Sequence, residues 1–258
     1  MTTPNISALL DAMTLEEQVS LLTGADFWTT VAIPRLGIPA IKVSDGPNGA
    51  RGGAFHGGPK TACFPVAIAL GSTWDPALVA EAGAALADEA RLKGAGVLLA
   101  PTVNLHRSTL NGRNFECYSE DPYLTGELAC GYIRGLQDHG VAATIKHFVC
   151  NDSEVERMSI DSVVDERTMR ELYLVPFEKA VKEANVQAVM TSYNRINGLF
   201  AGDNAPLVRD ILRGQWGFDG LVMSDWFAEH DTDLSAAAGM DLEMPGTTRH
   251  RGEALVES

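Results

Sequence analysis

Short apolar segments in this 258-residue chain end in residues that could do chemistry. The clearest example covers residues 221–226, where an apolar run stops at Asp225 and Trp226. A carboxylate at the end of a buried strand is costly to place unless it is paired or has a function. Asp225 is therefore a candidate for catalysis. The alternative at this point is that it only caps the helix that follows.

Other apolar segments also end in polar side chains, and two further arginines add to the set. These residues are Asp45, Arg51, Asn104, Arg113, Lys146, His147, Arg157 and Tyr193. Carboxylates accept hydrogen bonds, Arg, Lys and His donate them, and Trp226 offers an apolar ring face, which together suit a sugar. A phosphate would be repelled by Asp45 and Asp225. The six histidines have no metal-ligand spacing such as H-E-x-x-H.

Apolar runs of strand length alternate with helical segments along the chain. The predicted strands cover residues 41–44, 97–100, 141–145, 186–190 and 221–226, with a further one at 240–244. The predicted helices begin at residues 15, 75, 121, 165, 207 and 231, and Pro176 breaks the fourth of them. This alternation indicates an α/β fold with a parallel sheet. The polar residues then share one rim, as in barrels and doubly wound folds.

Composition indicates an ordinary globular protein, with 45% hydrophobic and 21% charged residues and a length suited to one barrel domain. The net charge of −14 argues against nucleic acid and anionic membranes as partners. The N-terminus has no signal-peptide pattern and no run of 18 apolar residues occurs, so a cytoplasmic location is expected. The four cysteines lack C-x-x-C spacing, which predicts buried free thiols.

Six segments resemble the successive motifs of glycoside hydrolase family 3 and occur in the family's order. They are KVSDGPNGAR at 42–51, GRNFE at 112–116, SEDP at 119–122, KHF at 146–148, MTSYN at 190–194 and SDW at 224–226. Six matches are far more specific than one. The resemblance is to the β-glucosidase branch, because Asp45 stands where xylosidase-type members usually carry Glu.

The resemblance implies a (β/α)8 TIM-type barrel with the activity of a retaining exo-β-glucosidase, and Asp225 matches the catalytic nucleophile. Basic neighbours are expected to lower the pKa of Asp225. The residues that match substrate-binding positions are Asp45, Arg51, Arg113, Lys146, His147, Arg157, Met190, Tyr193 and Trp226. The expected partner is a small β-glucoside, with no metal and no cofactor. The alternative within the same family is a β-xylosidase.

Glycoside hydrolysis requires two carboxyl groups, and the resemblance accounts for only one of them in this chain. In the resembling family the general acid/base is a Glu from a later domain, and none of Glu116, Glu154, Glu229 and Glu243 matches it. Residues 1–258 are therefore expected to form a single barrel that lacks its last βα segment or two, has no closing helix and is nearly inactive alone. Any homo-oligomer contacts are expected in the missing region.

Several readings remain open beside the glucosidase. The chain is either catalytic or a non-catalytic sugar-binding fragment, and a lyase or aldolase with Lys146 as a Schiff-base lysine is the unrelated alternative. Glu116 and Glu120 are expected to pair with the basic groups rather than to do chemistry. Glu229, just past Asp225, either borders the entrance to the site or lies on a solvated helix face.

Overall fold

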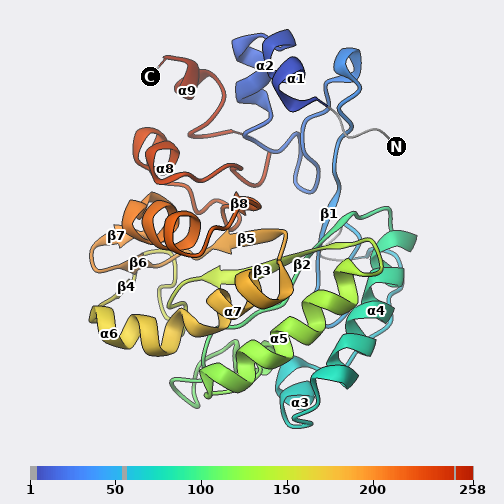
Figure 1. Ribbon diagram of the computed structural model, residues 1–258, viewed down its shortest axis with the longest axis vertical. Helices are drawn as coiled ribbons and strands as arrows, with labels where there is room; N and C mark the ends of the chain where they lie inside the picture. The colour runs from blue at the N-terminus through green and yellow to red at the C-terminus, as the bar shows by residue number, and fades with distance from the viewer. Residues whose placement is uncertain (1–4, 54–56, 247, 258) are drawn as a thin grey trace.

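A parallel sheet forms the centre of the computed structural model, which describes residues 5–53, 57–246 and 248–257 (Figure 1). Its five strands lie in the order β1-β2-β3-β5-β8. Their bounds are Val43–Asp45 for β1, Val97–Leu99 for β2, Ala142–Phe148 for β3, Ala188–Thr191 for β5 and Leu221–Met223 for β8. The predicted α/β fold with a parallel sheet is confirmed.

The register of the sheet brings the carboxyl ends of its strands to one rim. Val97 of β2 pairs with Val43 of β1 on one side and with Ala142 of β3 on the other. The pairing of β3 with β5 shifts between Ile145 and Phe148. Such an irregularity re-aims the side chains within it. The two residues inside it are Lys146 and His147, which come from the middle of the predicted site.

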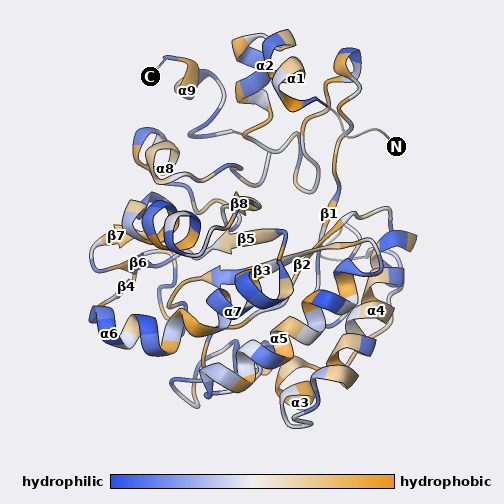
Figure 2. Cartoon of the chain, viewed as in Figure 1, coloured by the Kyte–Doolittle hydropathy of each residue, from blue (hydrophilic) through white to orange (hydrophobic). Residues whose placement is uncertain are grey.

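Helices α4 (Pro76–Leu92), α5 (Pro122–Gln137) and α7 (Val175–Ala184) pack beside the sheet and beside one another (Figure 1). Asp75 and Asp121 cap α4 and α5 through their carboxylates, and a proline begins each helix, as predicted. Figure 2 shows mostly hydrophobic residues along β2 and β5, whereas α6 (Glu166–Thr168) is hydrophilic. No helix in the described part of the chain is both long and apolar enough to span a membrane.

Three predicted elements differ in part from the structure. The predicted helix from residue 165 is divided into α6, the π-helical η3 (Met169–Tyr173) and α7, whose first turn holds Pro176. Proline has no N–H to continue a helix, so the predicted break is confirmed. The strand predicted at 240–244 is wrong, because this segment pairs with its neighbours only at isolated bridges. The helix predicted at 207–215 is the π-helical η5 (Pro206–Gln215).

Isolated bridges continue the sheet from β8 back to β1. Leu242 pairs with Met223, and Glu243 pairs in parallel with Thr23, just after α2 (Leu15–Ser20). Thr29 then pairs with Lys42, the residue before β1. The N-terminal segment therefore closes the ring of pairings that begins with the five strands. That this ring is an eight-stranded barrel short of its last segments stays a prediction.

The remaining elements are small. The helical ones are α1 (Ile6–Ala12), η1 (Pro34–Leu36), α3 (Ala67–Gly71), η2 (Asn114–Glu116), η4 (Ala201–Asp203), α8 (Thr232–Ala238) and α9 (Glu253–Glu257). A second sheet contains β4 (Asp161–Ser162), β6 (Arg195–Ile196) and β7 (Leu199–Phe200). No closing helix was expected after residue 244, and the structure has the five-residue α9 there, packed on α2. Cys63 is exposed, so only the other three thiols are buried as predicted.

Candidate active site

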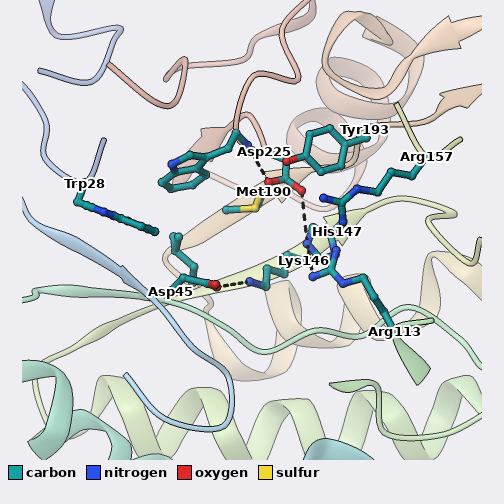
Figure 3. Close-up of a pocket in the computed structure, with 11 residues that line it drawn as sticks. Trp28, Asp45, Arg113, Lys146, His147, Arg157, Met190, Tyr193 and Asp225 are labelled. Atoms are coloured by element: carbon teal, nitrogen blue, oxygen red, sulfur yellow. Dashed lines mark hydrogen bonds and ion pairs between the residues drawn. The ribbon is translucent and has the colours of Figure 1, made fainter. Parts of the chain in front are cut away.

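A pocket of about 180 Å³ lies where the carboxyl ends of the parallel strands meet (Figure 3). Asp45 comes from the end of β1, Lys146 from the irregular part of β3, and Asp225 from just beyond β8. The pocket is lined by Trp28, Asp45, Leu99, Arg113, Lys146, His147, Arg157, Met190, Tyr193, Asp225 and Trp226. Every predicted site residue except Arg51 is in this set.

Asp225 is the buried carboxylate of the pocket, with only 8% of its surface exposed. One of its oxygens, Oδ1, accepts the N–H of Trp226 at 2.7 Å, and the Tyr193 hydroxyl donates to the carboxylate. Burial raises the pKa of Asp225 above its ordinary value, although the charge of Lys146 acts against this. The basic neighbours lower this pKa, as expected, but the net shift is upward, because the loss of hydration outweighs the attraction of the cations.

The neutral tautomer of His147 follows from its neighbours. The side-chain oxygen of Asn104 accepts the backbone N–H of His147 at 3.0 Å and lies 3.2 Å from Nδ1, so Nδ1 carries the ring proton. Nε2 is then free to accept from Nη2 of Arg113 at 3.2 Å. Burial, followed by the charge of Arg113, holds the pKa of His147 well below its ordinary value. His147 therefore orients Arg113 beside Asp225 without adding charge.

A second carboxylate, Asp45, forms an ion pair with Lys146 on the other side of the pocket. Nζ of Lys146 lies 3.0 Å from Oδ1 of Asp45, and Lys146 is 3% exposed. Burial opposes ionisation of Asp45, but Lys146 and then Arg51 hold its pKa below the ordinary value. Nε of Arg51 is 3.4 Å from Oδ2 of Asp45, and its side chain is 44% exposed. Arg51 thus supports Asp45 from outside the pocket.

Glu154 holds the two pocket arginines in place. Its Oε2 lies 2.9 Å from Nη1 of Arg157, and its Oε1 lies 3.8 Å from Nη1 of Arg113. Arg113 also pairs with Glu116, as predicted, whereas Glu120 is exposed and forms none of the ion pairs found among the described residues. The guanidinium of Arg157 lies 4.7 Å from the ring centroid of Tyr193. No sequence pattern marks Glu154 as the shared partner of these arginines.

Trp28 and Trp226 form an aromatic wall. Their ring centroids are 5.4 Å apart, and Nε1 of Trp226 donates to the carbonyl of Phe27 at 3.1 Å. Figure 3 shows Trp28 across the pocket from Arg113. Trp28 was not predicted, because its segment reaches the site only through pairings far apart in the sequence. No local pattern marks it as a residue of the pocket.

The pocket combines features that suit the ring of a sugar. Asp45 can accept from hydroxyls, the cationic side chains can donate to them, and the two tryptophans offer apolar faces. Asp45 and Asp225 are the two carboxylates among the described lining residues. No group of three potential metal ligands occurs in the described part of the chain. A parallel α/β sheet with such a pocket at its carboxyl rim has the form of an α/β enzyme domain.

The chain matches one known protein family over nearly its whole length. The family described as Glycosyl hydrolase family 3 N terminal domain matches residues 2–256, and the chain belongs to this family. A β-glucosidase of Rhizobium radiobacter is 67% identical over 97% of this chain and 31% of its own length. A probable β-glucosidase I of Aspergillus clavatus is 52% identical over 98% of this chain and 30% of its own length. The chain spans about a third of the length of these curated relatives.

Solved structures show the same similarity in three dimensions. The β-glucosidase of Kluyveromyces marxianus in complex with glucose has a TM-score of 0.97 and 48% identity, over 99% of this chain and 31% of that one. β-Glucosidase 3B of Thermotoga neapolitana in complex with α-D-glucose has a TM-score of 0.93 and 41% identity, over 98% of this chain and 39% of that one.

Proposed function

We propose that this chain is the nucleophile-bearing part of a retaining exo-β-glucosidase that hydrolyses terminal non-reducing β-D-glucosyl residues. One observation carries the proposal: the buried carboxylate of Asp225 shares a small pocket with donors, an acceptor and an aromatic wall that together suit one sugar ring. The names of the relatives support glucose as that sugar. A β-xylosidase is the alternative.

In the proposed reaction, Asp45 accepts from hydroxyls far from the anomeric carbon, and Lys146 and Arg113 donate to others. The ionised carboxylate of Asp225 attacks the anomeric carbon, and the bond from that carbon to the aglycone oxygen breaks. A protonated general acid gives the departing oxygen its proton. Water then attacks the anomeric carbon, loses a proton to the same group and releases glucose and Asp225.

The general acid is proposed to lie outside this chain. Glu116 and Glu154 pair with the pocket arginines, Glu229 forms a buried ion pair with Arg251, and Glu243 accepts hydrogen bonds from the backbone. None of these glutamates is among the described residues that line the pocket. Glu229 therefore neither borders the entrance nor lies on a solvated helix face, in contrast to both expectations.

Pocket size supports cleavage at a chain end. The volume of about 180 Å³ is below the roughly 300–1,000 Å³ of most small-molecule sites, so it suits one ring rather than an oligosaccharide. Lys146 is engaged in an ion pair with Asp45, which gives the Schiff-base alternative no support.

Covalent trapping tests the assignment. A 2-deoxy-2-fluoro-β-glucoside with a dinitrophenyl leaving group needs no general acid for the first step, so it should add one fluoroglucosyl group to the complete gene product. Intact-mass and peptide analysis should place that group on Asp225. Absence of an adduct on the folded protein, or an adduct that survives in Asp225→Ala, would contradict the proposed function and would favour a non-catalytic sugar-binding protein.

A further inference from the structure

The turn that follows Asp225 contains a bulky residue in left-handed backbone conformation. Phe227 has φ of +66°, its N–H donates to the carbonyl of Met244 at 2.8 Å, and the N–H of Ala228 donates to the carbonyl of Asp225 at 3.0 Å. This conformation is unfavourable for a residue with a large side chain, and it persists only where surrounding contacts fix it. The turn that carries Asp225 therefore depends on contacts from outside itself.

Residues 249–251 supply such contacts at two points. The guanidinium carbon of Arg249 lies 4.7 Å from the centroid of the Phe227 ring. Nε of Arg251 lies 2.9 Å from Oε1 of Glu229, and each of these two side chains is only 1% exposed. Nη2 of Arg251 also donates to the carbonyl of Met240 at 3.0 Å. The segment thus contacts the turn both at Phe227 and just beyond it at Glu229.

Segment 249–251 is itself anchored by a buried carboxylate. Glu243, 3% exposed, accepts the N–H groups of Arg249 at 3.0 Å, His250 at 3.3 Å and Arg251 at 3.0 Å. Successive backbone N–H groups that converge on one carboxylate satisfy its charge without a cation. The hydroxyl of Thr232 donates to the carbonyl of His250 at 2.9 Å. These hydrogen bonds hold the backbone of the segment in place, independently of the contacts that its side chains make with the turn.

We propose that residues 249–251 form a clamp that positions Asp225, with Arg251 as the main positioning residue. Neither Arg251 nor Glu229 is among the described residues that line the pocket, so their effect passes through the turn and not through the sugar. The inference rests on the proposed function, in which Asp225 is the nucleophile. Loss of the clamp then slows the attack of Asp225 and leaves sugar binding unchanged.

Arg251→Met in the complete gene product tests the clamp, because methionine keeps much of the side-chain length and removes the charge. Inactivation by the fluoroglucoside gives the binding constant and the trapping rate separately. The trapping rate should fall on the order of 10²-fold with an unchanged binding constant, since small displacements of a reacting group have effects of this size. Arg251→Lys should restore part of the rate. A folded Arg251→Met protein with the wild-type trapping rate, or with binding weakened in proportion, would overturn the clamp.

If Arg251→Met does not fold, Arg249→Leu provides the test instead. Arg249 is exposed, so its replacement leaves the core intact. Leucine lacks the positive charge that attracts Arg249 to the ring of Phe227, so trapping should slow about two- to fivefold. An unchanged rate in this variant would overturn the clamp. Arg209→Met, which removes an exposed arginine paired with Asp210 on η5, is the matched control and should behave as wild type. If the wild-type protein itself is not trapped on Asp225, the proposed function fails, whatever the variants do.

Discussion

At the scale of single residues, the protonation of Asp225 is set by two opposing effects. Burial raises its pKa, whereas Lys146, the N–H of Trp226, Arg113 and the Tyr193 hydroxyl act in the opposite direction. Attack on a sugar needs the ionised carboxylate, so the rate of trapping must rise with pH as Asp225 loses its proton. The acidic limb of this profile is therefore expected above the ordinary pKa of an aspartate.

Tyr193→Phe tests this balance by removing one hydroxyl. Without that donor the charged form of Asp225 is less stable, so its pKa rises further and the acidic limb moves to higher pH. The measurement is the trapping rate of the fluoroglucoside from pH 4 to 8. Tyr123→Phe, which alters an exposed tyrosine on α5, is the control and should leave the profile in place. A limb that stays in place or moves to lower pH in Tyr193→Phe would contradict the assignment.

Most of the site residues could be predicted from sequence, because polar residues at the ends of apolar runs meet wherever parallel strands share a rim. Asp45, Lys146 and Asp225 were found in this way. Trp28 and Glu154 could not be, since each reaches the site through loop geometry that no local pattern encodes. The raised pKa of Asp225 was also missed, because the effect of burial exceeds that of the charged neighbours, and no local pattern encodes the depth of burial.

At the scale of elements, close contact between helices α4 and α5 depends on glycine. A Cβ added at Gly135 of α5 would lie 2.1 Å from the carbonyl oxygen of Ala80 on α4. No side-chain rotation can relieve a clash with backbone, so the two helices would have to move apart. The small residues of α5 thus set the distance between the helices that cover the sheet.

Gly135→Ala is expected to lower the free energy of unfolding by about 2 kcal/mol, in spite of the better helix propensity of alanine. Denaturant unfolding of the complete gene product measures the change. Gly96→Ala is the matched control, because an added Cβ there meets nothing within 4 Å, and a change within about 0.5 kcal/mol is expected. Equal stability of the two variants would show that the helices are not held this closely.

Elements with strong local signals were predicted well, and elements fixed by distant pairing were not. The capped starts of α4 and α5 and the break at Pro176 follow from side chains next to them in sequence. The segment 240–244 has the apolar composition of a strand, but its neighbours meet it only at single residues. The small second sheet was missed because two-residue strands carry no periodicity.

At the scale of the whole molecule, two carboxyl groups outside the pocket, the buried Asp203 and the half-buried Asp152, affect how stability depends on pH. Burial raises the pKa of Asp152 to about 7 and that of Asp203 to about 6. In the unfolded chain an aspartate releases its proton near pH 4. Between these values the folded state holds more protons than the unfolded state, so these groups make stability fall as pH rises.

Asp152→Asn isolates one such contribution. Asparagine can still accept the N–H of Leu105, which lies 2.9 Å from Oδ1 of Asp152, but it never ionises. The free energy of unfolding of the variant, minus that of wild type, should be about 2 kcal/mol larger at pH 8 than at pH 5. Denaturant unfolding at both values measures this difference, with the exposed Glu120→Gln as control. An equal effect of Asp152→Asn at the two pH values would contradict the raised pKa.

The ring of pairings sets the order in which the molecule can assemble. Thr23 pairs with Glu243, so closure joins residues separated by almost the whole chain. Contacts of such long sequence separation have a high entropic cost and form late. Trp28 lies in the segment that this pairing holds, so the aromatic wall is completed only when Thr23 and Glu243 meet. During synthesis, the strands and helices between them can fold first, and the pocket is completed last.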